Sequence, residues 1–177
     1  MDQKKWEECV KFHGHECPGL AIGFRATEIA MEKMGKKFSA DSDEKIVCIT
    51  ENDACGVDAV QVLSGCTLGK GNLIYKPCGK MAFSFFDRSG NDAIRIVLKP
   101  NATKDMDREQ SKMHILTGPE DELFWIKKPN YTVPENARLF GSVVCEVCEE
   151  SAPEHKIRIQ EGKQVCLDCF NDYDNRW

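Results

Sequence analysis

The sequence predicts a main domain of mixed helices and strands, followed by a small metal-binding module. Apolar residues recur at intervals of three and four between Pro18 and Met34, which is the spacing of an amphipathic helix. A continuous apolar run within residues 45–50 is typical of a strand that is buried on both faces. Two Cys-x-x-Cys pairs lie near the C-terminus, and this pattern is typical of a structural zinc site.

Length and charge narrow the class of function. The chain has 177 residues, enough for one domain and a small module. It carries 24 basic and 29 acidic side chains, and this net charge of −5 argues against broad nucleic-acid binding. No apolar run approaches the ~20 residues of a membrane span, and the first residues lack the apolar core of a signal peptide. We therefore expect a cytoplasmic protein that uses neither a membrane nor nucleic acid.

The remaining elements follow from apolar patterns and turn signals. We expect a core domain at 1–130, a linker at 131–139 and a finger at 140–177. Within the core, the expected helices cover 2–12, 18–34, a segment capped by Asp53, 105–116, and a short piece from 119 to about 126. The expected strands cover 45–50, 73–76, 81–87 and 93–98, with a turn at 41–43.

The segment Phe12–Gly19 holds the best candidate for a functional site. His13, His15 and Cys17 lie within five residues, directly before a helix. Pro18 is favoured at the first helical position, which makes Cys17 the N-cap, where free N–H groups and the helix dipole favour a thiolate. Imidazole nitrogen and thiolate sulfur are ligands that zinc and similar metals prefer. The alternative is a packed cysteine beside two loop histidines.

Cys55 is the expected partner of this cluster. It follows the buried strand and should lie in the first turn of the next helix, after an N-cap at Asp53. Ligands in open α/β sheets bind at the carboxyl ends of strands, which is where this thiol lies. We expect Cys17 and Cys55 to be more acidic than a free cysteine, because each begins a helix. Glu16 and Asp58 are candidate proton-transfer groups, although neither spacing nor residue type singles them out.

The C-terminal module contains the ligand pairs Cys145/Cys148 and Cys166/Cys169. A hairpin is expected between the pairs and a short helix from Cys169 to the end, an order that resembles a treble-clef finger. So small a module cannot bury enough core to fold alone, so a structural zinc should stabilise it. Its four basic and eight acidic side chains oppose phosphate binding and favour a role in protein contact or stability.

Three motifs together resemble the FmdE family of formylmethanofuran dehydrogenase subunits. They read HGHECPGLAIG at 13–23, ENDACGVDAVQ at 51–61 and GCTLGKGNL at 65–73, and an aromatic strand follows at 79–86. The resemblance covers about residues 5–130. The C-terminal module looks like the zinc finger that some members of that family carry.

The resemblance implies a thioredoxin-like α+β core, in which helices flank a mixed β-sheet. It also implies a pocket of His13 or His15 with Cys17 and Cys55, holding a second zinc or another transition metal, and able to stand empty. The family is named for a molybdenum or tungsten enzyme of one-carbon metabolism, and pairing of two chains is common in it. Because the core has no Cys-x-x-Cys, dithiol exchange of the usual kind is not supported.

Three functions remain open from the sequence. The first is a metal-binding accessory protein of a molybdenum or tungsten oxidoreductase, and the second is a metalloenzyme with three protein ligands and an open fourth position. The third is a thiol redox protein that uses Cys17 with Cys55. A homodimer is expected, partly from the resemblance and partly because the strands within 81–98 carry apolar side chains on both faces. Ten cysteines suit an anaerobic host.

Overall fold

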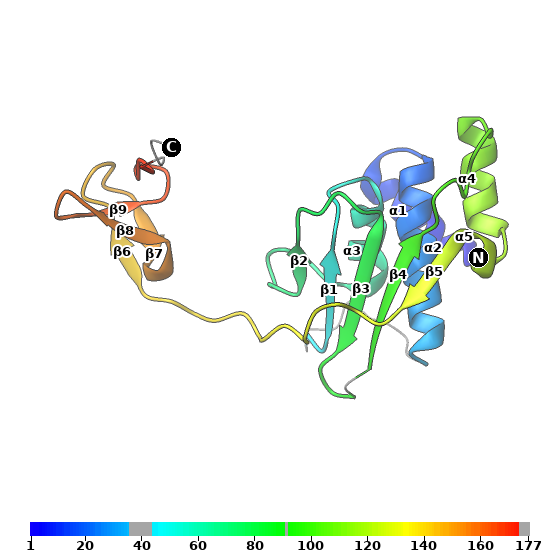
Figure 1. Ribbon diagram of the computed structural model, residues 1–177, viewed down its shortest axis with the longest axis horizontal. Helices are drawn as coiled ribbons and strands as arrows, with labels where there is room; N and C mark the ends of the chain where they lie inside the picture. The colour runs from blue at the N-terminus through cyan, green and yellow to red at the C-terminus, as the bar shows by residue number, and fades with distance from the viewer. Residues whose placement is uncertain (36–43, 91, 174–177) are drawn as a thin grey trace. The chain divides into compact units, whose positions relative to one another are not determined.

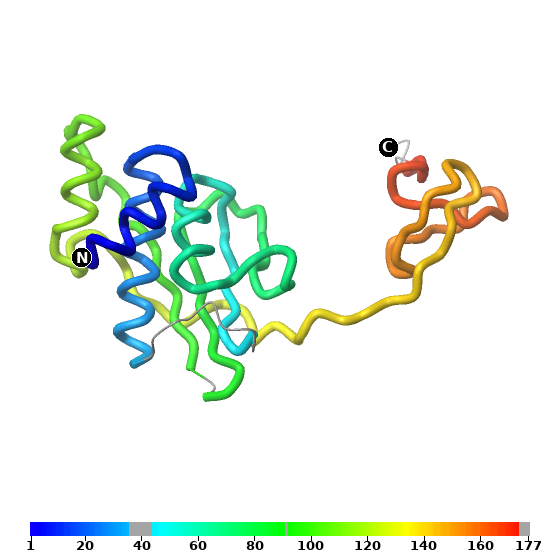
Figure 2. Tube along the Cα trace, turned by 180° about the vertical axis from the view of Figure 1, so that it is seen from behind, coloured from blue at the N-terminus to red at the C-terminus, as the bar shows by residue number. Residues whose placement is uncertain are grey.

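The computed structural model describes residues 1–35, 44–90 and 92–173, and its chain forms two compact units. The first unit is Met1–Ala137 and the second is Arg138–Trp177 (Figures 1 and 2). The turn expected at 41–43 lies outside the described residues. None of the helices in the described ranges combines the length and the apolar character needed to cross a bilayer.

The first unit is built on a five-stranded mixed sheet with the strand order β2-β1-β3-β4-β5. Strands β1 and β2 run parallel, whereas the pairs β1–β3, β3–β4 and β4–β5 are antiparallel. The strand bounds are β1 Ile46–Thr50, β2 Leu73–Tyr75, β3 Ala82–Asp87, β4 Ala93–Leu98 and β5 Phe124–Lys127. The expected α+β class with a mixed sheet is confirmed, while the thioredoxin-like topology stays a prediction.

Helices α1, α2 and α3 cover one face of this sheet, as Figures 1 and 2 show from opposite sides. The helix bounds are α1 Gln3–His13, α2 Pro18–Lys33, α3 Gly56–Ser64, α4 Arg108–Thr117 and α5 Glu120–Leu123. The central helix α2 packs against α1, α3 and α4. Its buried Phe24 meets Trp6 edge-on at 5.3 Å between ring centroids, and the core continues to Phe83 and Phe85 of β3.

Helices α2 and α3 approach each other through glycines. A Cβ atom added at Gly23 would lie 1.9 Å from the carbonyl oxygen of Gly56, so only glycine fits at this contact. The contact brings the first turns of the two helices together. Because Cys17 and Cys55 are the N-cap residues of α2 and α3, the same contact brings these two cysteines to one place.

Several expected boundaries change in the structure. Asp53 does not cap α3: the helix begins at Gly56 after Cys55, because the side chain of Asn52 accepts the Ala54 N–H and holds a turn first. The helix expected from residue 105 begins only at Arg108, where Asp107 forms a capping box.

The prediction of a short helix that reaches about residue 126 was wrong for the second half of that helix. It ends at Leu123, and Phe124–Lys127 form the edge strand β5. Phe124 is buried in the core cluster, and the residues after it pair with the free edge of β4. Pairing with β4 and burial of Phe124 therefore override the helical signal of the acidic start.

The sheet face opposite the helices is partly covered by residues 128–137, which we call the strap. Tyr131 of the strap packs against a second buried cluster of Val47, Ile49 and Phe86. The Arg88 guanidinium donates to the carbonyl oxygen of Pro134, at 3.1 Å. The linker expected at 131–139 is therefore packed on the sheet over its first part, and this face needs less cover from a second chain than we expected.

The second unit consists of two short hairpins. The first pairs β6 (Ser142–Val144) with β7 (Ser151–Pro153), and the second pairs β8 (Ile157–Gln160) with β9 (Lys163–Cys166), with the 3-10 turn η1 (Glu154–Lys156) between them. The hairpin expected between the cysteine pairs is therefore present.

The terminal helix of the treble-clef-like order is absent from residues 170–173, and residues 174–177 lie outside the described part. The Gln160 side chain donates to the carbonyl oxygen of Asn171 at 2.9 Å and accepts its N–H at 3.1 Å. These two bonds hold the backbone beside β8 and leave the groups at Asn171 unavailable to a helix.

Candidate metal centres

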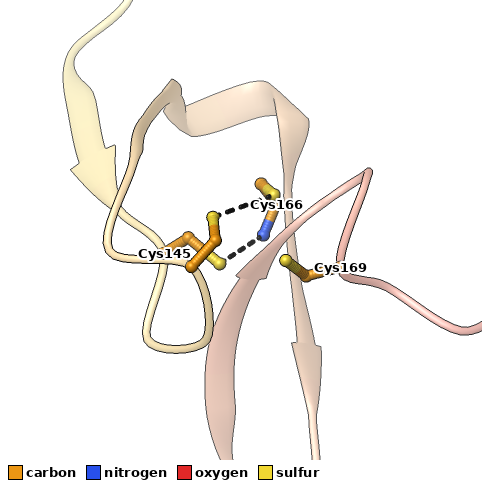
Figure 3. Close-up of side chains that lie close together, drawn as sticks. Cys145, Cys166 and Cys169 are labelled. Carbon is orange, nitrogen blue, oxygen red and sulfur yellow. Dashed lines mark hydrogen bonds between the residues drawn. The ribbon is translucent and has the colours of Figure 1, made fainter.

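The four cysteines of the second unit form a compact sulfur cluster. Their sulfur atoms all lie within 4.8 Å of one another. The Cys148 and Cys166 sulfurs are 3.9 Å apart, and a tetrahedral zinc with bonds of ~2.3 Å places its sulfurs about 3.8 Å apart. Figure 3 shows Cys145, Cys166 and Cys169 pointing toward a common centre. The donor set and its spacing therefore fit one zinc ion.

Backbone N–H groups favour the thiolate form of one cysteine of this cluster, Cys145. The Cys166 N–H donates to the Cys145 sulfur at 3.3 Å. Backbone N–H groups of Cys148 and Cys166 lower the pKa of the Cys145 thiol to about 6. Thiolate, not thiol, is the form that binds a metal, so this local backbone favours zinc binding.

The first unit brings His13, His15 and Cys17 together between α1 and α2. One ligand atom from each lies within 4.8 Å of the others, and the two imidazole centroids are 4.5 Å apart. His13 Nε2 lies 3.8 Å from the Cys17 sulfur. Cys17 is the N-cap of α2, as expected, and its sulfur accepts the Leu20 N–H at 3.3 Å. Cys17 is buried, His13 is partly buried and His15 is exposed.

Asp58 of α3 fixes the ring of His13. Its carboxylate lies 2.7 Å from His13 Nδ1, so Nδ1 carries the proton and Nε2 is free to accept a bond on the side of Cys17. Gln61, one turn further along the helix, donates to the same carboxylate at 3.4 Å. Asp58 lies three residues after Cys55, which places the two on one helical face, but its contact with His13 spans 45 positions and no local signal predicts it.

Cys55 lies beside Cys17 but is not more acidic than a free cysteine. A Cβ atom added at Gly19 would lie 3.5 Å from the Cys55 sulfur and 3.9 Å from the Cys17 sulfur, so the two sulfurs flank this glycine. Burial, and then the neighbouring Cys17 thiol, raise the pKa of Cys55. The expected acidity was wrong for Cys55 because removal from water and a neighbouring thiol outweigh the helix terminus.

Glu16, the other candidate proton-transfer group, belongs to a different contact. Its carboxylate pairs with the ammonium of Lys112 on α4, and this bond lowers the pKa of Glu16. Glu16 therefore joins the segment between α1 and α2 to helix α4 by an ion pair. Among the two candidates, Asp58 is the one that faces the His13–Cys17 cluster.

A cleft of about 450 Å³ opens beside this cluster. It lies at the carboxyl end of β1, where the strand position predicted a ligand site. Most of its walls fall within the three motifs at 13–23, 51–61 and 65–73, but the motifs alone did not predict that these residues line one cleft. The lining residues come from α1, β1, α3, β2 and the segments that follow β1 and α3: His13, Thr50, Asn52, Asp53, Ala54, Cys55, Val57, Asp58, Gln61, Leu68, Leu73 and Tyr75.

Comparisons with known proteins bear on the fold and the family of this chain. A solved FmdE-like protein from Syntrophus aciditrophicus, named for tungsten formylmethanofuran dehydrogenase, superposes with a TM-score of 0.66 over 93% of this chain and 91% of its own, at 23% identity. A protein of Archaeoglobus fulgidus named "Probable S-adenosyl-L-methionine-binding protein" is 32% identical over 92% of this chain, which spans about half (51%) of that protein.

Two family profiles divide the chain between them. Residues 138–175 match the prokaryotic dksA/traR C4-type zinc finger. This match and the four-sulfur cluster support zinc binding in the second unit. Residues 12–127 match the family described as "FmdE, Molybdenum formylmethanofuran dehydrogenase operon", which covers most of the first unit. The chain is therefore a member of the FmdE family that carries a C-terminal C4-type zinc finger.

Proposed function

We propose that this chain is a metal-binding accessory protein with an open transition-metal site in its core and a structural zinc in its finger. The observation that best supports the core site is the double engagement of His13, with Nδ1 on Asp58 and Nε2 toward Cys17. Metal-ligating histidines typically donate their second N–H to a carboxylate, which fixes the ring and its tautomer. A histidine that only packed in a loop would not need this arrangement.

The spacing also suits a metal. A zinc ion bound to one imidazole nitrogen and one thiolate places these two atoms about 3.6 Å apart, and His13 Nε2 lies 3.8 Å from the Cys17 sulfur. The group of ligand atoms that lie within 4.8 Å of one another is His13, His15 and Cys17 and does not include Cys55. Our proposal takes Cys55 as the third ligand because its sulfur flanks Gly19 together with that of Cys17. We assign the nitrogen ligand to His13 and not to the exposed His15, because only His13 is oriented by a carboxylate.

Three ligands leave a fourth position that an exogenous group can occupy. A metal bound there would supply Lewis-acid character at the wall of the cleft. The residues of the chain would orient the metal ligands and exclude water. Asp58 holds the His13 ring, and the side of the site formed by buried Cys17 is closed to water.

The accessory part of the proposal concerns a partner enzyme. The family description and the name of the solved relative both refer to formylmethanofuran dehydrogenase, which supports a molybdenum or tungsten oxidoreductase as partner. We extend the proposal to one-carbon metabolism in the cytoplasm of an anaerobe. The finger exposes Val144, Val147 and Ile159 on an acidic module, which suits protein contact better than phosphate contact. We also propose a homodimer, and sedimentation at micromolar concentration that shows a 20 kDa species alone would contradict it.

The experiment for the core site is a cobalt titration of the full chain with its finger already loaded with zinc, under anaerobic conditions. We expect a sulfur-to-cobalt absorption band and one further metal equivalent per chain. Cys17→Ser and Cys55→Ser should each weaken the band, whereas Cys78→Ser, at an exposed thiol outside the pocket, should leave it unchanged. An identical band in all four proteins would refute the core site.

A thiol redox function is a second candidate, favoured by the two sulfurs that flank Gly19. Oxidised glutathione would accept two electrons and two protons from the Cys17 and Cys55 thiols, so that one protein disulfide forms while the glutathione disulfide breaks and two molecules of reduced glutathione leave. A Cys17–Cys55 disulfide found by mass spectrometry after mild treatment would support this function. Persistence of both thiols under conditions that oxidise Cys78 would exclude it.

A further inference from the structure

The cleft beside the metal pocket has a second polar end, formed by Asp53 and Tyr75. Both residues line the cleft, and both are exposed at its mouth. We propose that this end binds the cationic group of a small organic molecule, such as an ammonium group. The inference rests on the proposed metal pocket in one respect only, since the far end of the same ligand would lie beside His13 and Cys55.

The charge of the cleft walls favours a ligand of positive charge. Two carboxylates, Asp53 and Asp58, line the cleft, and its described lining contains no lysine or arginine. Lys70 follows the lining residue Leu68 in the same loop but is not itself a wall of the cleft. A phosphate or carboxylate ligand would be repelled by the two carboxylates, and no basic side chain among these walls would offset the repulsion. A cation would be attracted by the same carboxylates.

Asp53 and Tyr75 combine two groups that attract cations. Burial, and then the negative charge of the nearby Asp53 carboxylate, raise the pKa of Tyr75, so its hydroxyl is protonated. An ionised carboxylate can accept about four hydrogen bonds, so Asp53 can accept from an ammonium group. The face of the tyrosine ring adds a cation–π attraction.

The middle of the cleft suits a small molecule with an apolar body. Val57, Leu68 and Leu73 supply apolar wall to the cleft that Asp53 and Tyr75 share with His13 and Cys55. The volume of about 450 Å³ lies within the usual range for small-molecule sites. The ligand class is thus a compact organic cation whose opposite end reaches the proposed metal.

The test uses three probes of nearly equal shape and different charge: phenethylamine, 2-phenylethanol and 3-phenylpropionate. Each is titrated into the full, zinc-loaded chain and followed by NMR chemical-shift changes. A ligand this small should bind in the millimolar range. We expect the amine to bind about fivefold more tightly than the alcohol, with shifts at Asp53 and Tyr75, and the carboxylate to bind most weakly.

Two variants and one matched control locate the effect. Asp53→Asn and Tyr75→Leu should each remove most of the preference for the amine, while Asp121→Asn, an exposed carboxylate on α5, should keep it. Equal binding of the three probes, no detectable binding of the amine, or shifts that map away from the cleft would overturn the proposal.

The same proteins separate this inference from the proposed metal site. Cys17→Ser should lose core cobalt but keep the preference for the amine, and Asp53→Asn should keep core cobalt but lose the preference. If cobalt binds as proposed and the amine shows no preference, the cation site alone is wrong. If the amine preference holds and no cobalt binds, the metal site alone is wrong.

Discussion

Replacing Gly23 with alanine tests whether the contact between α2 and α3 builds the core site. The added Cβ would lie 1.9 Å from the Gly56 carbonyl oxygen and 2.5 Å from its Cα, so backbone must move. Overpacking of this kind costs about 1–3 kcal/mol, and a clash with backbone belongs at the upper end. Alanine is the better helix former by ~1 kcal/mol, so the net loss should be about 2 kcal/mol.

For a unit of this size that loss lowers the melting temperature of the core by about 8 °C. Fluorescence of Trp6, which packs edge-on against Phe24 of α2, reports the transition. The same variant should weaken the cobalt band, because movement of α3 carries Cys55 away from Cys17. Gly69→Ala is the matched control, since nothing lies within 4 Å of its added Cβ. A Gly23→Ala protein that melts and binds cobalt like the parent would refute the reasoning.

Three further predictions concern other contacts. Cys148→Ser should remove one zinc per chain and make the second unit sensitive to protease while the core keeps its melting transition; zinc loss with unchanged proteolysis would contradict this. Arg95→Met should cost the core about 3–5 kcal/mol in urea unfolding, because it leaves the buried Glu51 carboxylate without its guanidinium, and a loss below ~1 kcal/mol would argue against it. Asp58→Asn should lower the cobalt affinity of the core about 10–100-fold by releasing the His13 ring, and an unchanged affinity would remove Asp58 from the site.

The parts of the fold that the sequence predicted well are those set by local signals. Pro18 after Cys17 predicted the start of α2, and the apolar runs predicted β1, β3 and β4 within a residue or two. Pairing between strands that lie far apart in the sequence was harder to predict. Nothing local in Phe124–Lys127 distinguishes a strand from the last turn of a helix, because the free edge of β4 decides it.

The two candidate sites also differed in how far local sequence signals could predict them. Two Cys-x-x-Cys turns define a zinc site by spacing alone, so the four cysteines of the finger could be predicted from the sequence, whereas the terminal helix expected after them is absent from residues 170–173. In the core, the sequence predicted that Cys17 and Cys55 converge but left the choice of histidine open. That choice depends on Asp58, which reaches His13 across 45 positions of the chain. The reversed pKa direction at Cys55 depends on burial, which helix position alone does not predict.

The finger site and the proposed core site should therefore respond differently to loss of metal. In the finger, the described residues form two short hairpins, and a bound zinc would hold the cysteine turns together. In the core, protein contacts alone hold the proposed ligands in place: Leu20 N–H binds Cys17, Asp58 binds His13, and the close approach of Gly23 to Gly56 sets α2 against α3. A chelator should then unfold the finger and leave the core folded with its pocket formed. Metal at the core site would be free to exchange without loss of the fold, as an open site for an exogenous ligand requires.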